Sequence, residues 1–155
     1  MATAKITPDR DAVVSEIEIA APPERVFPAL IEREQALQWG KSDQYEITEW
    51  EMDARLGGRW RFVSTERKAG GQIYRHHGEI LEIDPPRVLA YTWITSWQPD
   101  PSKVTVVRWE LTATKQGTHL KLTHSGLAPI SGAAEGYSQG WPGLLQQIRD
   151  FVEKR

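Results

Sequence analysis

The sequence contains no cysteine, which excludes disulfide bonds and thiolate metal sites. No apolar run is long enough to cross a membrane, and no apolar segment follows the first methionine. The 19 basic residues form no block and are balanced by 21 acidic ones, a pattern that gives no support to nucleic-acid binding. These absences predict a soluble, cytoplasmic protein without a membrane span or a nucleic-acid partner.

Common catalytic signatures are also missing. The chain shows no Ser/His/Asp motif, no paired-carboxylate signature and no glycine-rich phosphate loop. Gly57 and Gly58 lead directly into a predicted strand and match no nucleotide-binding fingerprint. We therefore assign no catalytic residue from motifs alone and expect no cofactor.

Tryptophan is abundant, with seven residues in a chain of 155. A buried indole N–H usually needs a hydrogen-bond acceptor, and large rings leave gaps unless they are closely matched. The composition therefore suggests an aromatic interior, with a cavity in place of a tight aliphatic core. The length suits one domain over residues 1–155, in which the polar residues 1–11 are expected to fray.

Two short helices are predicted near the N-terminus. Alternating apolar residues over Val13–Ile19 predict a strand. A helix is expected to begin near Pro22 and Pro23, and to be short or bent because Pro28 lies one turn inside it. A second short helix is predicted over Glu32–Gln38.

From Tyr45 onward the apolar period becomes two, and turn-like separators divide six predicted strands. These strands cover residues 45–52, 59–66, 72–83, 87–94, 104–114 and 118–125. The apolar pattern changes parity in the fifth, so we predict a bulge or a change of buried face between Val107 and Arg108. The order of elements predicts an α+β fold, in which a curved antiparallel sheet wraps around a long C-terminal helix.

The C-terminal segment combines helical periodicity with poor helix formers. The apolar residues at helical spacing are Trp141, Leu144, Leu145, Ile148, Phe151 and Val152. Pro142 cannot donate to the carbonyl of Ser138, so the helix is expected to start or kink there and to be regular over 144–153. Gly140 and Gly143 are expected to bring the backbone close to the sheet, with Trp141 projecting toward a cavity mouth. The alternative is a helix start anchored by one buried tryptophan.

Five segments in a fixed order resemble a known family: APPERVFPALIEREQALQW, LGGRWRF, GEILEIDPPRVLAYTW, LTHSGL and GWPGLL. Together they resemble the bacterial family related to the C-terminal domain of the activator of heat shock protein 90 ATPase. That family belongs to the START-like (SRPBCC) superfamily, which has the helix-grip fold and includes polyketide cyclases and lipid-binding proteins. The resemblance implies a cavity between sheet and helix for an apolar or amphipathic small molecule.

Strand alternation indicates which residues would line such a cavity. The predicted lining is Trp60, Phe62, Tyr74, His76, Tyr91, Trp93, Leu120, Leu122 and His124 from the strands, with Trp141 and Leu145 from the helix. Simple core packing is the alternative at each position. Charged residues of the opposite parity are expected to form cross-strand pairs on the convex face: Glu49, Glu51, Arg59, Arg61, Arg75, Glu79 and Glu82.

The four histidines do not have the spacing of a metal site. His76 and His77 are adjacent on a strand and point to opposite faces, and His119 and His124 also diverge. Only His76 and His124 are expected to meet, so no metal is predicted. Two alternatives to plain ligand binding stay open: a cyclase/dehydratase-type enzyme that uses His76 and His124, and a chaperone-accessory domain.

Overall fold

The computed structural model describes residues 1–68, 70–98, 100 and 102–154. Its strands are β1 (Thr3–Ile6), β2 (Ala12–Ile19), β3 (Tyr45–Met52), β4 (Arg59–Glu66), β5 (Ile73–Asp84), β6 (Val88–Thr95), β7 (Thr105–Ala113) and β8 (Thr118–Ser125). Its helices are α1 (Pro23–Ile31), α2 (Arg33–Trp39) and α3 (Ala133–Glu153). Within the described ranges, no helix is long and apolar enough to cross a membrane.

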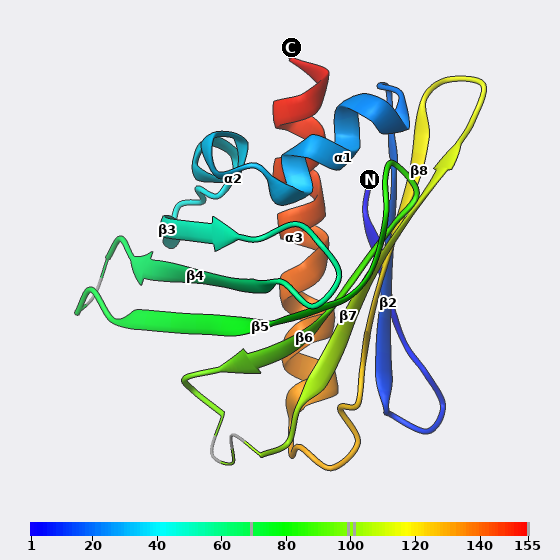
Figure 1. Ribbon diagram of the computed structural model, residues 1–155. Helices are drawn as coiled ribbons and strands as arrows, with labels where there is room; N and C mark the ends of the chain where they lie inside the picture. The colour runs from blue at the N-terminus through cyan, green and yellow to red at the C-terminus, as the bar shows by residue number, and fades with distance from the viewer. Residues whose placement is uncertain (69, 99, 101, 155) are drawn as a thin grey trace.

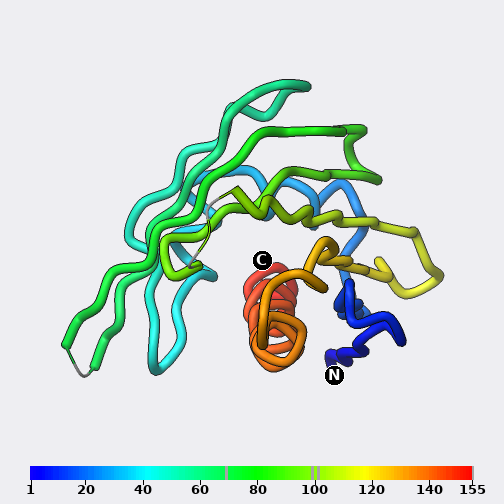
Figure 2. The backbone as a smooth tube through the Cα atoms, turned by 90° about the horizontal axis from the view of Figure 1, so that it is seen from below, coloured from blue at the N-terminus to red at the C-terminus, as the bar shows by residue number. Residues whose placement is uncertain are grey.

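All strands belong to one antiparallel sheet with the order β1-β2-β8-β7-β6-β5-β4-β3. The strands β3 to β8 follow one another as a meander. Strand β2 pairs with β8, and β1 then forms the edge beyond β2. The sheet curls around α3, which lies in its concave side (Figures 1 and 2). The predicted α+β helix-grip architecture is therefore confirmed.

The N-terminal segment contains an additional strand. Thr3–Ile6 pairs with β2 in register from Thr3 opposite Glu16 to Ile6 opposite Val13. The hydroxyl of Ser15 also donates to the Thr3 carbonyl at 2.7 Å. The expectation that residues 1–11 fray is therefore wrong for this segment, because backbone pairing holds a strand that has little apolar pattern of its own.

Strand β7 keeps one buried face from end to end. Thr105, Val107, Trp109 and Leu111 are all buried, and the pairing with β6 and β8 runs without a register shift. The predicted bulge between Val107 and Arg108 is wrong because Val106, which broke the pattern, simply lies half-buried on the other face. Register shifts occur instead in β3 after Ile47 and in β5 after Ile80.

Helix α3 begins at Ala133, well before the predicted regular start at Leu144, and Pro142 lies inside it. Its buried residues follow one face over the whole length: Ala133, Ala134, Trp141, Leu145, Ile148 and Val152. Burial of this face stabilises the helix in a segment of poor helix propensity. This explains why the start predicted from local propensity was too late.

Three glycines of α3 lie on its open side. A side chain built at Gly136, Gly140 or Gly143 would meet nothing within 4 Å, and all three are exposed. The expectation that Gly140 and Gly143 bring the backbone close to the sheet is therefore wrong. Their effect is on the helix itself, since each glycine in a helix interior lowers its stability by up to about 1 kcal/mol relative to alanine.

One glycine of the sheet is required by a close approach. A Cβ on Gly78 in β5 would lie 1.9 Å from the Thr92 carbonyl oxygen on β6. Trp60 lies opposite Gly78 on β4, and its indole N–H donates to that same carbonyl at 3.0 Å. The amide of Glu79 donates to the Thr92 hydroxyl at 2.8 Å. Gly78 therefore leaves the space through which a side chain of β4 bonds to β6.

Replacing Gly78 with alanine should destabilise the protein by about 2–3 kcal/mol, through overpacking against backbone and loss of the indole hydrogen bond. Urea unfolding measures the change, with Gly70→Ala as the control because a Cβ there meets nothing within 4 Å. Equal stability of the two variants would contradict this account of Gly78.

Candidate functional site

The space between the sheet and α3 is occupied by a cluster of rings. The predicted lining residues that are buried there are Trp60, Phe62, His76, Tyr91, Trp93, Leu120, Leu122, His124, Trp141 and Leu145. Strand β4 supplies the first two, β5 and β6 the next three, and β8 and α3 the rest. The fold thus brings together side chains from five elements, and strand parity predicted which strand residues would be among them.

Tyr74 is the predicted lining residue that lies outside this cluster. It has the same parity as His76, but it sits near the start of β5 and is half-buried. Its ring packs edge-on against Tyr45 of β3, with ring centres 5.9 Å apart. The ring reaches across β4 to the edge strand β3, so Tyr74 does not share the space covered by α3.

The rings form a continuous chain from the interior to the surface. Phe62 stacks on His76 at 4.2 Å between ring centres, and His76 lies 4.9 Å from Trp93. Trp93 contacts Tyr137 of α3, whose ring lies 5.6 Å from that of Trp97. Trp97 has 45% of its surface exposed. Trp97 and Tyr137 therefore mark the place where the aromatic interior reaches solvent.

Hydrogen bonds determine the tautomer of His124. The hydroxyl of Thr105 donates its single proton to the Trp93 carbonyl at 3.0 Å, so its 2.8 Å contact with Nε2 of His124 requires the histidine to donate. The indole of Trp141 donates to Nδ1 of His124 at 3.1 Å. His124 is therefore a neutral imidazole that carries its proton on Nε2, and both ring nitrogens are engaged.

Both interior histidines are held neutral. Burial lowers the pKa of His124 to about 3. Burial, with a smaller contribution from His77, lowers the pKa of His76 to about 4, and its Nδ1 is buried without a hydrogen-bond partner. His124 has no free nitrogen for proton transfer in this arrangement, whereas His76 retains one. No three metal-ligating side chains gather anywhere in the described part of the chain.

Several partners in this cluster were not identified from sequence. The indole of Trp93 donates to the Tyr137 hydroxyl at 3.0 Å, and that of Trp109 donates to the Tyr91 hydroxyl at 2.9 Å. Burial raises the pKa of both tyrosines, which keeps them protonated. The available signal for Tyr137 was its position four residues before Trp141, on the same helix face, but the helix was predicted to begin after it.

Two pockets lie elsewhere on the described surface. One of about 450 Å³ is bounded by α1, α2 and the end of α3. The other, of about 510 Å³, lies over β4 to β6 and is lined by charged residues such as Glu51, Arg59 and Arg61. Neither lies between the sheet and α3, where the rings pack against one another. Trp141, expected at a cavity mouth, is 5% exposed and lies inside the packed cluster.

The neutral histidines make stability depend on pH. Because their folded-state pKa values lie below the ordinary value, unfolding takes up protons below about pH 6.5. The free energy of unfolding should fall as the pH drops from 6.5 toward 4, by about 1.4 kcal/mol per pH unit for each histidine.

Urea unfolding between pH 4.5 and 7.5 measures this slope. His124→Asn keeps an acceptor near the Trp141 indole but cannot titrate, so its slope should be shallower. The control Gln38→Asn, at an exposed position of α2, removes no titratable group and should keep the wild-type slope. Identical slopes in all three proteins would contradict the assignment.

Comparisons with known proteins agree with this fold. A family model described as Activator of Hsp90 ATPase homolog 1-like protein matches residues 20–153. No curated protein matches the chain in sequence.

Solved structures cover almost the whole chain. Protein CV1439 from Chromobacterium violaceum is 26% identical with a TM-score of 0.80, covering 92% of this chain and 98% of its own. Protein MLL2253 from Mesorhizobium loti is 27% identical with a TM-score of 0.73, covering 92% and 97%. The AHSA1-like protein from Aeromonas hydrophila, at 19% identity and a TM-score of 0.75, covers 92% of each chain and shows the shared fold. The chain belongs to the family of Activator of Hsp90 ATPase homolog 1-like proteins.

Proposed function

We propose that this is a cytoplasmic binding protein that takes up an apolar or amphipathic small molecule between the sheet and α3. The START-like fold commonly binds ligands in this place. The interior offers what such sites use, namely aromatic faces with a few fixed polar groups. Because the rings are packed in the present arrangement, the ligand enters by displacing some of them.

The observation that carries this proposal is the composition of the first half of α3. The segment that supplies Tyr137 and Trp141 to the ring cluster also contains Gly136, Gly140 and Pro142. Proline removes a helical hydrogen bond, and each glycine weakens the local helix. The part of α3 that covers the aromatic interior is therefore the part with the lowest intrinsic helix stability. We infer that this segment moves away from the sheet to admit the ligand.

The interior histidines suit binding better than catalysis. His124 uses both nitrogens to hold Trp141 and Thr105, so proton transfer through it would break the packing of the helix against the sheet. His76 retains a buried nitrogen without a partner, which supplies one polar contact to a ligand. A ligand with an apolar ring system and a hydroxyl group fits this chemistry.

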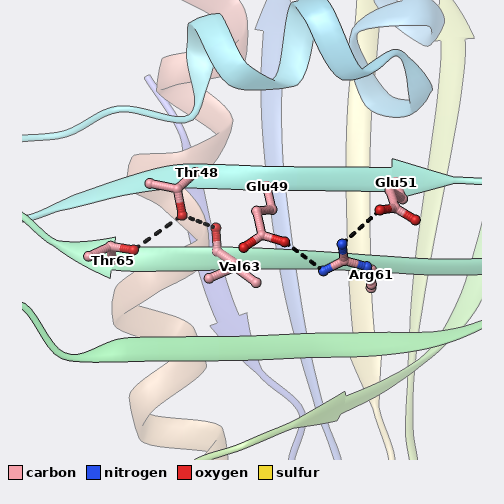
Figure 3. A network of polar contacts seen from close by, with 6 residues as sticks. All are labelled: Thr48, Glu49, Glu51, Arg61, Val63 and Thr65. Atoms are coloured by element: carbon pink, nitrogen blue, oxygen red, sulfur yellow. Dashed lines mark hydrogen bonds and ion pairs between the residues drawn. The ribbon is translucent and has the colours of Figure 1, made fainter.

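The convex face gives little support to a chaperone-accessory role. Arg61 donates to Glu49 at 3.0 Å and to Glu51 at 2.7 Å, and the hydroxyls of Thr48 and Thr65 lie 3.2 Å apart (Figure 3). The two Arg61 pairs are among those expected from strand parity, whereas the contact between the two threonines was not predicted. They cover the outside of β3 and β4 with polar groups, whereas a protein-docking site usually exposes a large apolar patch.

Removing the Tyr137 ring should ease entry to the interior. Tyr137→Ala is expected to raise the rate of uptake of Nile red, an apolar planar fluorophore, by roughly tenfold, because about 1.4 kcal/mol of barrier corresponds to that factor. Stopped-flow fluorescence measures the rate, and Tyr45→Ala, which removes a ring outside the cluster, should leave it unchanged. Absence of saturable binding to both the wild type and Tyr137→Ala would leave simple core packing as the role of the rings.

Strengthening α3 should have the opposite effect. Gly140→Ala fills open space and should raise the free energy of unfolding by about 0.5–1 kcal/mol, while it slows Nile red uptake. Gly70→Ala, in a loop, serves as the control and should change neither quantity. A stability gain with an unchanged uptake rate would show that α3 does not open for the ligand.

A further inference from the structure

The pocket bounded by α1, α2 and α3 lies at the other end of α3 from the aromatic interior. Its walls are Arg25 and Pro28 of α1, Glu32 between the two short helices, Gln35 of α2 and Val152 of α3. Figure 1 shows α1 and α2 beside the C-terminal half of α3. Val152 is fifteen residues beyond Tyr137, which corresponds to about 22 Å along a helix axis. The volume of about 450 Å³ lies within the usual range for small-molecule sites.

Arg25, which lines this pocket, has a buried nitrogen whose missing hydrogen-bond partner needs an explanation. Its Nη2 is buried and has no hydrogen-bond partner, although buried polar groups are almost always bonded. An arginine side chain stays protonated, so a buried donor without an acceptor carries a desolvation cost. Arg25 lines the pocket, so a turn of its guanidinium toward an anion bound there would give Nη2 an acceptor and remove this cost.

The other residues of the pocket restrict the kind of anion. Glu32 forms no ion pair with Arg25 within the described structure; instead its carboxylate accepts a hydrogen bond from the Gln35 amide at 2.8 Å. Because Glu32 brings a negative charge to the same pocket, a dianion such as phosphate is disfavoured there. Pro28 and the buried Val152 add an apolar wall on which an uncharged ligand body can pack.

We propose that this pocket binds a monocarboxylate with a small apolar body. The carboxylate accepts hydrogen bonds from the Arg25 guanidinium, for which the planar fork of arginine is well matched. The apolar body lies against Pro28 and Val152, and Glu32 excludes ligands of higher charge. The site is separate from the aromatic interior and does not depend on binding there.

Sodium benzoate is a suitable probe, and titration at low salt followed by ¹H–¹⁵N NMR locates it. Shifts are expected in α1, α2 and the last turn of α3. Arg25→Gln should weaken binding by roughly tenfold or more, the range for losing a charged hydrogen bond. Arg33→Gln makes the same charge change at an exposed position of α2 and should leave affinity within about twofold, as expected for a charge screened by solvent.

Two further variants keep the test decisive if Arg25→Gln does not fold, which circular dichroism will show. Arg25→Lys keeps the charge without the fork and should bind more weakly than the wild type. Glu32→Gln removes the repelling charge and should bind benzoate more tightly. Neutral benzamide should not bind, and inorganic phosphate should bind less well than benzoate.

Several results would overturn the proposal. One is that benzoate shows no saturable binding, and another is that benzamide or phosphate binds as well as benzoate. A third is that Arg33→Gln weakens benzoate binding as much as Arg25→Gln does. Shifts confined to the ring cluster around Trp93 would also overturn it, while they would support binding in the aromatic interior. If Nile red is not taken up while benzoate binds at Arg25, the proposal for the aromatic interior fails and the proposal for this pocket stands. The two sites are therefore tested independently.

Discussion

A buried indole N–H must find an acceptor, because a donor left unsatisfied in the interior costs about 1–3 kcal/mol, and this chain buries six of its seven tryptophans. Each of the six donates to an identified acceptor. These pairs are Trp39 with the Ala29 carbonyl, Trp50 with Ile31, Trp60 with Thr92, Trp93 with Tyr137, Trp109 with Tyr91, and Trp141 with His124.

Most of these hydrogen bonds connect helices and strands that are not neighbours in the sheet. Trp39 and Trp50 tie α2 and β3 to α1, Trp60 spans from β4 to β6, and Trp93 and Trp141 attach α3 to the sheet. Glycine at position 78 and the neutral tautomer of His124 follow from the same requirement. The rings supply apolar area, and their N–H groups fix how the layers are placed.

Much of this arrangement was predictable, because strand alternation assigns each side chain to a face. It correctly placed Trp60, Phe62, His76 and Trp93 on the concave side. Parity does not tell how far along the sheet the covering helix extends, so Tyr74 was assigned to the cluster although it lies beyond it.

Helix α3 shows the second limit of sequence reasoning. Local propensity around Gly136 and Gly140 argues against helix, and packing of one buried face overrides it. With the helix start placed too late, Tyr137 was missed as the residue that receives the Trp93 indole. Strand β1 was missed for a related reason. It is held by backbone pairing with β2 and is largely exposed, so its sequence shows no alternating apolar pattern. The pocket beside Arg25 depends on three helices meeting, which no local pattern encodes.

The pairing of β2 with β8 also bears on how the chain reaches this state. Val13 lies opposite His124, so β2 must wait for a strand that is synthesised much later. Long-range pairing of this kind slows folding, because a large loop must close before the contact forms. Helix α3 follows all the strands in the chain, and until it has been synthesised the aromatic face of the sheet has no cover. A nascent chain with this topology is therefore expected to depend on protection from aggregation during synthesis, in proportion to the time its tryptophans spend uncovered.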